Sequence, residues 1–67
     1  MQMTLKAARV NAGYTQNEAA QKIGVTVDTL SNWERGKCFP SVIHLRAILS
    51  CYGVEYDDLI FLPSNNG

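Results

Sequence analysis

The sequence predicts an all-α domain of five short helices. Glycines at positions 13, 24, 36 and 53 each follow a run in which apolar residues recur every three or four positions, as on one face of a helix. Glycine commonly ends a helix because it tolerates the left-handed backbone conformation. No segment alternates apolar and polar residues as a half-buried strand does. We therefore expect one domain over residues 1–62 and a flexible tail over 63–67.

The first four helices each have a side chain that can cap the start. A hydroxyl at this position accepts a hydrogen bond from the first helical turn, and the four candidates are Thr4, Thr15, Thr26 and Ser41. Thr15 and Glu18 also match a capping box. The periodicity predicts these inward side chains: Leu5, Ala8 and Ala12; Ala19, Ala20 and Ile23; Leu30 and Trp33; and Leu45, Ile48, Leu49 and Tyr52.

A fifth helix is expected over residues 56–61, because Pro63 stops a helix there and Glu55 suits the positive end of the helix dipole. This segment has more apolar surface than one short helix can bury beneath itself. Part of it should close the core, and part should form the interface of a homodimer. The candidates for that interface are Tyr56, Leu59, Ile60, Phe61 and Leu62.

Length and composition argue against several classes of protein. A chain of 67 residues forms one modest core without a deep catalytic cleft, and its longest apolar run, residues 59–62, is far shorter than the roughly 20 residues that span a bilayer. Cys38 and Cys51 form no C-x-x-C motif, which favours reduced thiols in the cytoplasm over a structural disulfide. Together with His44 they fit no common zinc spacing. We expect no catalytic residue, metal, cofactor, small-molecule ligand or membrane association.

Charge is distributed unevenly along the chain. All six basic residues precede position 47, against three acidic residues there, whereas residues 47–67 carry three acids and no base. The net charge of zero is therefore the sum of +3 on residues 1–46 and −3 on residues 47–67. Such a chain can orient itself on a polyanion without binding every polyanion strongly.

Residues 15–36 match the spacing of a helix-turn-helix, in which the second helix enters the DNA major groove. On the second helix, Asp28, Asn32 and Arg35 should point away from Leu30. Asn can contact adenine, Asp can accept from cytosine, and a methyl group can touch thymine. The alternative is an ordinary solvated helix face, but the paired caps and glycine stops favour DNA reading.

The motifs resemble the phage repressor and Cro type of helix-turn-helix domain, the XRE family, over residues 4–62. The resemblance is carried by Thr15-Gln16-x-x-Ala19-Ala20-x-x-Ile23-Gly24-Val25-Thr26, by Leu30-Ser31-Asn32-Trp33-Glu34-Arg35-Gly36-Lys37, and by Pro40, Leu45, Ile48, Gly53, Val54 and Leu59. It implies a five-helix, lambda-repressor-like fold. It also implies a phosphate contact by Gln16 and base reading by Val27, Asp28, Thr29 and Asn32. Ala8 and Ala19 depart from the leucines common in the family.

Two further sets of residues are assigned from the chain itself. Arg35, Lys37 and Ser41 surround the end of the third helix and the start of the fourth, where cations and backbone N–H groups can hold a phosphate; a solvated basic loop is the alternative. Arg9 and Glu34 both fall on inward-leaning faces. A structural ion pair between them is expected, which the resemblance also implies.

These observations predict a sequence-specific regulator that binds double-stranded DNA. The most specific form of the prediction is a small repressor of phage or mobile-element type that occupies an operator as a homodimer. Alternatives are the antitoxin of a toxin-antitoxin pair and a protein-interaction module with a vestigial DNA face. An enzyme is the least favoured class, because no acid-base pair is present apart from Arg9 and Glu34.

Overall fold

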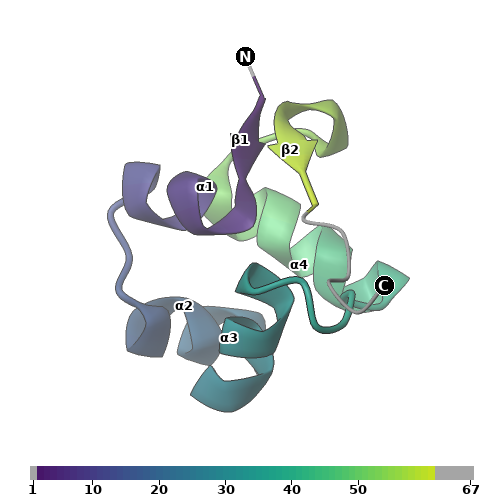
Figure 1. Ribbon diagram of the computed structural model, residues 1–67. Coiled ribbons are helices and arrows are strands. Elements are labelled where there is room, and N and C mark those ends of the chain that lie inside the picture. Colours follow the sequence, from purple (N-terminus) through teal and green to yellow (C-terminus); the bar gives the residue numbers. More distant parts are fainter. Residues whose placement is uncertain (1, 62–67) are drawn as a thin grey trace.

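Four α-helices account for most of the domain in the computed structural model, which describes residues 2–61 (Figure 1). They are α1 (Leu5–Asn11), α2 (Gln16–Ile23), α3 (Val27–Glu34) and α4 (Val42–Tyr52). The predicted all-α class is confirmed. Leu62 and the tail predicted over 63–67 lie outside the described residues. No helix within residues 2–61 is long and apolar enough to cross a membrane.

Every helix begins at its predicted hydroxyl cap. Thr4, Thr15 and Thr26 each accept a hydrogen bond from the backbone N–H three residues later, at 3.1 to 3.2 Å. Ser41 does the same for the His44 N–H at 3.4 Å. The helix ends agree as well, because the glycines at 13, 24, 36 and 53 all have positive φ. Local side-chain chemistry thus sets where the helices begin and end.

The fifth helix is where the prediction is wrong. Residues Tyr56–Asp58 form one 3₁₀ turn, and Leu59–Ile60 form a short strand, β2. This strand pairs in parallel with β1 (Met3–Thr4), so that Met3 lies opposite Leu59 and Thr4 opposite Ile60. A helix this short is marginal by itself, whereas pairing with β1 satisfies backbone groups and directs Leu59 into the core.

The core lies where α1, α3 and α4 meet α2 and the strand pair. Leu30 of α3 and Ile48 of α4 are its largest fully buried side chains. Most predicted inward side chains are buried, but Ala12, Leu45 and Leu49 remain partly exposed. The other buried apolar residues are Leu5, Ala8, Ala19, Ala20, Ile23, Trp33, Tyr52 and Leu59.

The same substitution at a buried and at an exposed isoleucine of α4 distinguishes the effect of burial from the effect of helix propensity. We expect Ile48→Val to destabilise the domain by about 1 kcal/mol, because one buried methyl group is lost, and to lower the Tm by about 4 to 8 °C. Ile43→Val is the matched control, since the Ile43 side chain is 78% exposed. Thermal unfolding followed by circular dichroism compares the two. Equal Tm values for both variants would contradict the placement of Ile48 in the core.

Candidate nucleic-acid interface

Helices α2 and α3 form a helix-turn-helix at one end of the domain, opposite α1 and the strand pair (Figure 1). The turn runs from Gly24, whose φ of 92° closes α2 in the left-handed conformation, to Thr26, which caps α3. The backbone N–H groups of Gly24 and Val25 both donate to the carbonyl of Ala20, at 2.8 and 2.9 Å. These bonds close the end of α2 and fix the first part of the turn.

The inner face of α3 anchors it to the core. Leu30 is fully buried, and Trp33 and Glu34 are nearly so. On the opposite face Asp28 and Arg35 are exposed, whereas Thr29 and Asn32 are half-buried. Val27 packs partly against the core. The four residues predicted to read bases therefore differ in access, and Asp28 is the most open of them.

Two of these side chains already have partners within the helix. The Thr29 hydroxyl lies 2.9 Å from that of Thr26. The Arg35 Nη2 group donates to Asn32 Oδ1 at 3.2 Å, which leaves the Asn32 amide N–H groups for another acceptor. The base-reading assignment stays a prediction. In the free protein, the Asn32 amide oxygen faces Arg35.

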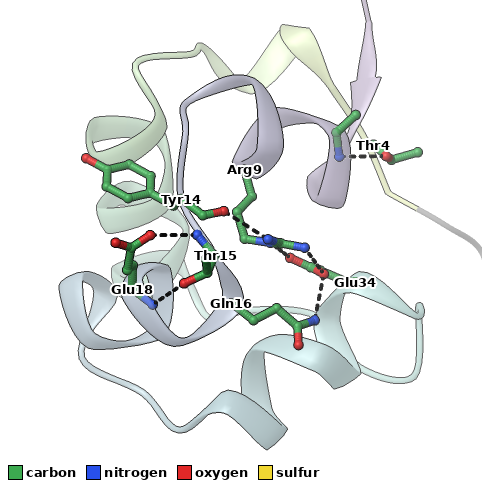
Figure 2. Close-up of polar contacts among 8 residues, drawn as sticks. Thr4, Arg9, Tyr14, Thr15, Gln16, Glu18 and Glu34 are labelled. Atoms are coloured by element: carbon green, nitrogen blue, oxygen red, sulfur yellow. Dashed lines mark hydrogen bonds and ion pairs between the residues drawn. The ribbon is translucent and has the colours of Figure 1, made fainter.

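The Arg9 side chain of α1 and the Glu34 side chain at the end of α3 form a buried ion pair (Figure 2). Arg9 Nε donates to Glu34 Oε2 at 2.7 Å, and Nη2 approaches Oε1 at 3.4 Å. Arg9 Nη1 donates to the Tyr14 carbonyl at 2.9 Å. The guanidinium thus connects α1, the loop before α2 and the last residue of α3, as expected for a structural pair.

Gln16 has a contact that sequence reasoning did not find. Its Nε2 donates to Glu34 Oε1 at 3.0 Å, so the residue predicted to hold a phosphate also contacts the buried ion pair (Figure 2). Gln16 and Glu34 are 18 positions apart and on different helices. No local spacing rule connects such residues, so the sequence carried no signal for this bond.

Tyr52 of α4 adds a buried phenol near the same ion pair. Within the described residues its hydroxyl has no hydrogen-bond partner. Burial raises the pKa of Tyr52 well above its ordinary value, and the negative charge of Glu34 acts in the same direction. The phenol therefore stays neutral, and the ion pair meets no second negative charge there.

The loop between α3 and α4 presents the other predicted phosphate-binding residues. Arg35, Lys37 and Ser41 are all exposed. The Ser41 Oγ atom lies 3.1 Å from His44 Nδ1, and the His44 ring lies 5.4 Å from the Trp33 ring. His44 therefore connects the loop to the inner face of α3.

The cysteines take no part in this arrangement. Cys38 is exposed in the loop and Cys51 is half-buried in α4, and both are free thiols. Among residues 2–61, no group of three or more His, Cys, Asp or Glu side chains is placed to hold a metal ion.

An aromatic cluster of Phe39, Tyr56 and Phe61 lies on the surface near the start of α4. The Phe61 ring is 5.8 Å from Phe39 and 6.0 Å from Tyr56. With Pro40 and Leu45 these rings line a cavity of about 270 Å³. The neighbouring Val42 and Ile43 are 72% and 78% exposed.

This surface revises the set of dimer candidates. Leu59 is buried in the core of the monomer and has little surface left for a partner, and Leu62 lies outside the described residues. Tyr56 and Ile60 are exposed. The exposed apolar residues Phe39, Val42 and Ile43 were not among the predicted candidates, although Ile43 lies off the inward stripe of α4, which is a readable signal.

Comparison with known proteins agrees with this geometry. The family model described as helix-turn-helix matches residues 5–59. The chain belongs to this family, and it is of the XRE type. Proteins of this family are DNA-binding transcriptional regulators and not enzymes.

Three curated relatives carry the same description. The chain is 43% identical over 56 residues to the HTH-type transcriptional regulator ImmR of Bacillus subtilis, a match that covers 84% of the chain but only 44% of ImmR. It is 33% identical to an uncharacterized HTH-type transcriptional regulator of Methanothermobacter thermautotrophicus, over 100% of the chain and 97% of the relative. It is 27% identical to the uncharacterized regulator YgzD of Bacillus subtilis, over 98% and 100% of the two chains. No solved structure gives a significant match.

Removal of the buried carboxylate should destabilise the domain. We expect Glu34→Ala to lower the Tm by several degrees or more, because it leaves the Arg9 guanidinium buried without its counter-charge, a change that typically costs about 3 to 5 kcal/mol. Asp28→Ala on the exposed face of the same helix is the matched control and should change the Tm little. Differential scanning calorimetry measures both variants. An unchanged Tm for Glu34→Ala would contradict the structural role of the pair.

Proposed function

We propose that the chain is a sequence-specific, double-stranded DNA-binding regulator, in particular a small repressor of phage or mobile-element type that acts in the cytoplasm. One observation carries this proposal: α3 is anchored from behind by Leu30, Trp33 and the Arg9–Glu34 ion pair, while its outer face carries short polar side chains. A rigid helix with a free polar face is what the major groove accepts.

Base reading is assigned to Val27, Asp28, Thr29 and Asn32. Their side chains are short, so bases can approach the helix closely, and Asn32 keeps amide N–H groups available beside Arg35. Asp28 is exposed and repels phosphates, so it should favour particular sequences without adding general affinity.

Phosphate binding is assigned to Gln16 at the start of α2 and to Arg35, Lys37 and Ser41 at and after the end of α3. The two cations and the serine are exposed on the loop that follows α3. Phosphate contacts from two different segments would fix the depth and register of the reading helix in the groove.

A homodimer is the proposed functional form. One small module binds DNA weakly, and two reading helices about 34 Å apart match successive major-groove faces. The exposed apolar residues at the aromatic cluster support a contact between two copies, with Tyr56, Ile60 and Phe61 joined by Phe39, Val42 and Ile43. A bound dimer would repress by occupying the operator and excluding polymerase.

DNA reading is tested on a duplex selected from a random-sequence pool by the purified protein. We expect Asn32→Ala to weaken binding to the selected duplex by about 1 to 3 kcal/mol and to relax preference at one base pair, because a base contact is lost. Fluorescence anisotropy measures each affinity at several salt concentrations.

Lys37→Ala is the matched comparison, since the Lys37 side chain is exposed, whereas that of Arg35 is bonded to Asn32 Oδ1. It should weaken selected and scrambled duplexes alike and reduce the slope of log affinity against log salt by about 0.9, because one phosphate-bound cation is lost. If Asn32→Ala keeps the wild-type ratio between selected and scrambled DNA, the base-reading assignment is wrong. If the wild-type protein selects no sequence, an interaction module becomes the better description.

The dimer is tested by placing a charge on the aromatic cluster. We expect Phe39→Asp to shift the protein toward the monomer in sedimentation equilibrium and to weaken binding to a two-half-site duplex, because Phe39 is 62% exposed and its replacement leaves the core intact. Val10→Asp is the control, since Val10 is 58% exposed on α1 and outside the cluster. Equal effects of the two variants on self-association would contradict this interface.

A further inference from the structure

We infer that Glu34 is a positioning residue for DNA binding: through its hydrogen bond to Gln16 it fixes the amide of Gln16 so that this amide can donate to a DNA phosphate. The inference rests on the proposed function and adds a second role for a carboxylate that otherwise serves only the ion pair. It depends on the Gln16 Nε2 to Glu34 Oε1 contact of 3.0 Å.

The chemistry of the contact sets the orientation of the amide. An ionised carboxylate only accepts hydrogen bonds, so the Gln16 atom that faces Glu34 must be Nε2 and not the amide oxygen. Arg9 holds the Glu34 carboxylate in place with two further bonds, at 2.7 and 3.4 Å. One Nε2 hydrogen is therefore used, and the second points away from Glu34.

The Gln16 side chain extends from the start of α2, where an anion is favoured. Gln16 is the first residue of α2, directly after the Thr15 cap. The capping box uses the N–H groups of Thr15 and Glu18, with Glu18 Oε1 at 2.9 Å from Thr15 N. Within the described residues, the backbone N–H groups of Gln16 and Asn17 have no acceptor. These groups and the Gln16 amide are donors that one phosphate can share.

Glu34 thereby connects a DNA contact to the placement of the reading helix. It is the last residue of α3 and its carboxylate reaches the first residue of α2. A long glutamine side chain loses rotamer freedom when it binds a phosphate, and a side chain already held in place loses less. The hydrogen bond to Glu34 restricts the Gln16 side chain in the free protein, so less rotamer entropy is lost when DNA binds.

The test is a double-mutant cycle on the duplex that the wild-type protein selects from a random pool. Glu34→Asp keeps the negative charge near Arg9 but withdraws the oxygen from Gln16, and Gln16→Met removes the amide at similar size. We expect Glu34→Asp to weaken binding about five- to tenfold when Gln16 is present and less than twofold in the Gln16→Met background. The salt slope should not change, because the amide is neutral.

Gln21→Met is the matched control, since Gln21 is exposed on the same helix. It should change affinity less than twofold. A purely structural role of Glu34 predicts the same loss of affinity in both backgrounds, and that result would overturn the inference while leaving the proposed function intact. Absence of any selected duplex would overturn both.

The inference can also be tested by NMR on the wild-type protein, where the result does not depend on whether a variant folds. In ¹H–¹⁵N spectra, one side-chain amide proton of Gln16 should be shifted in the free protein by the bond to Glu34. Addition of the selected duplex should shift the second proton of the same amide, while the amide of Gln21 stays unchanged. If DNA leaves both Gln16 amide protons in place, Glu34 does not act through Gln16.

Discussion

The ion pair between Arg9 and Glu34 is the interaction on which the arrangement of this domain depends. Its atoms belong to α1 and α3, and its hydrogen bonds extend to the Tyr14 carbonyl and the Gln16 amide. Apolar packing alone tolerates small rotations of a helix about its axis, whereas a bidentate pair in a buried setting fixes distance and direction together. Such a pair adds little net stability compared with apolar side chains, so its value here lies in precise placement.

Basic and acidic side chains are concentrated in different parts of the chain. The six bases precede position 47, and the three acids after that point lie around the 3₁₀ turn and its start. In Figure 1 this turn lies beside β2, at the end of the domain away from α2 and α3. Repulsion between DNA and these acids is therefore weakest when the α2 and α3 end faces the duplex, which favours one orientation of approach.

Sequence reasoning succeeded where structure depends on neighbours along the chain. Thr15 with Glu18, and glycines with positive φ such as Gly24, act within one helical turn, so their effects are readable from spacing. It failed for the segment after Glu55, because the competing structure, a strand, exists only through pairing with Met3 and Thr4. The same limit explains why the Gln16 bond to Glu34 was missed and why Leu59 was listed among the dimer candidates: both depend on residues brought together by the finished fold.

The pairing of β1 with β2 has a consequence for the order of folding. Met3 and Leu59 are neighbours in space but lie near opposite ends of the described chain, and Leu59 fills part of the core. A growing polypeptide that emerges from the ribosome can form its capped helices early, but it cannot close this core until residue 59 is free. The core is therefore completed only after residue 59 has left the ribosome.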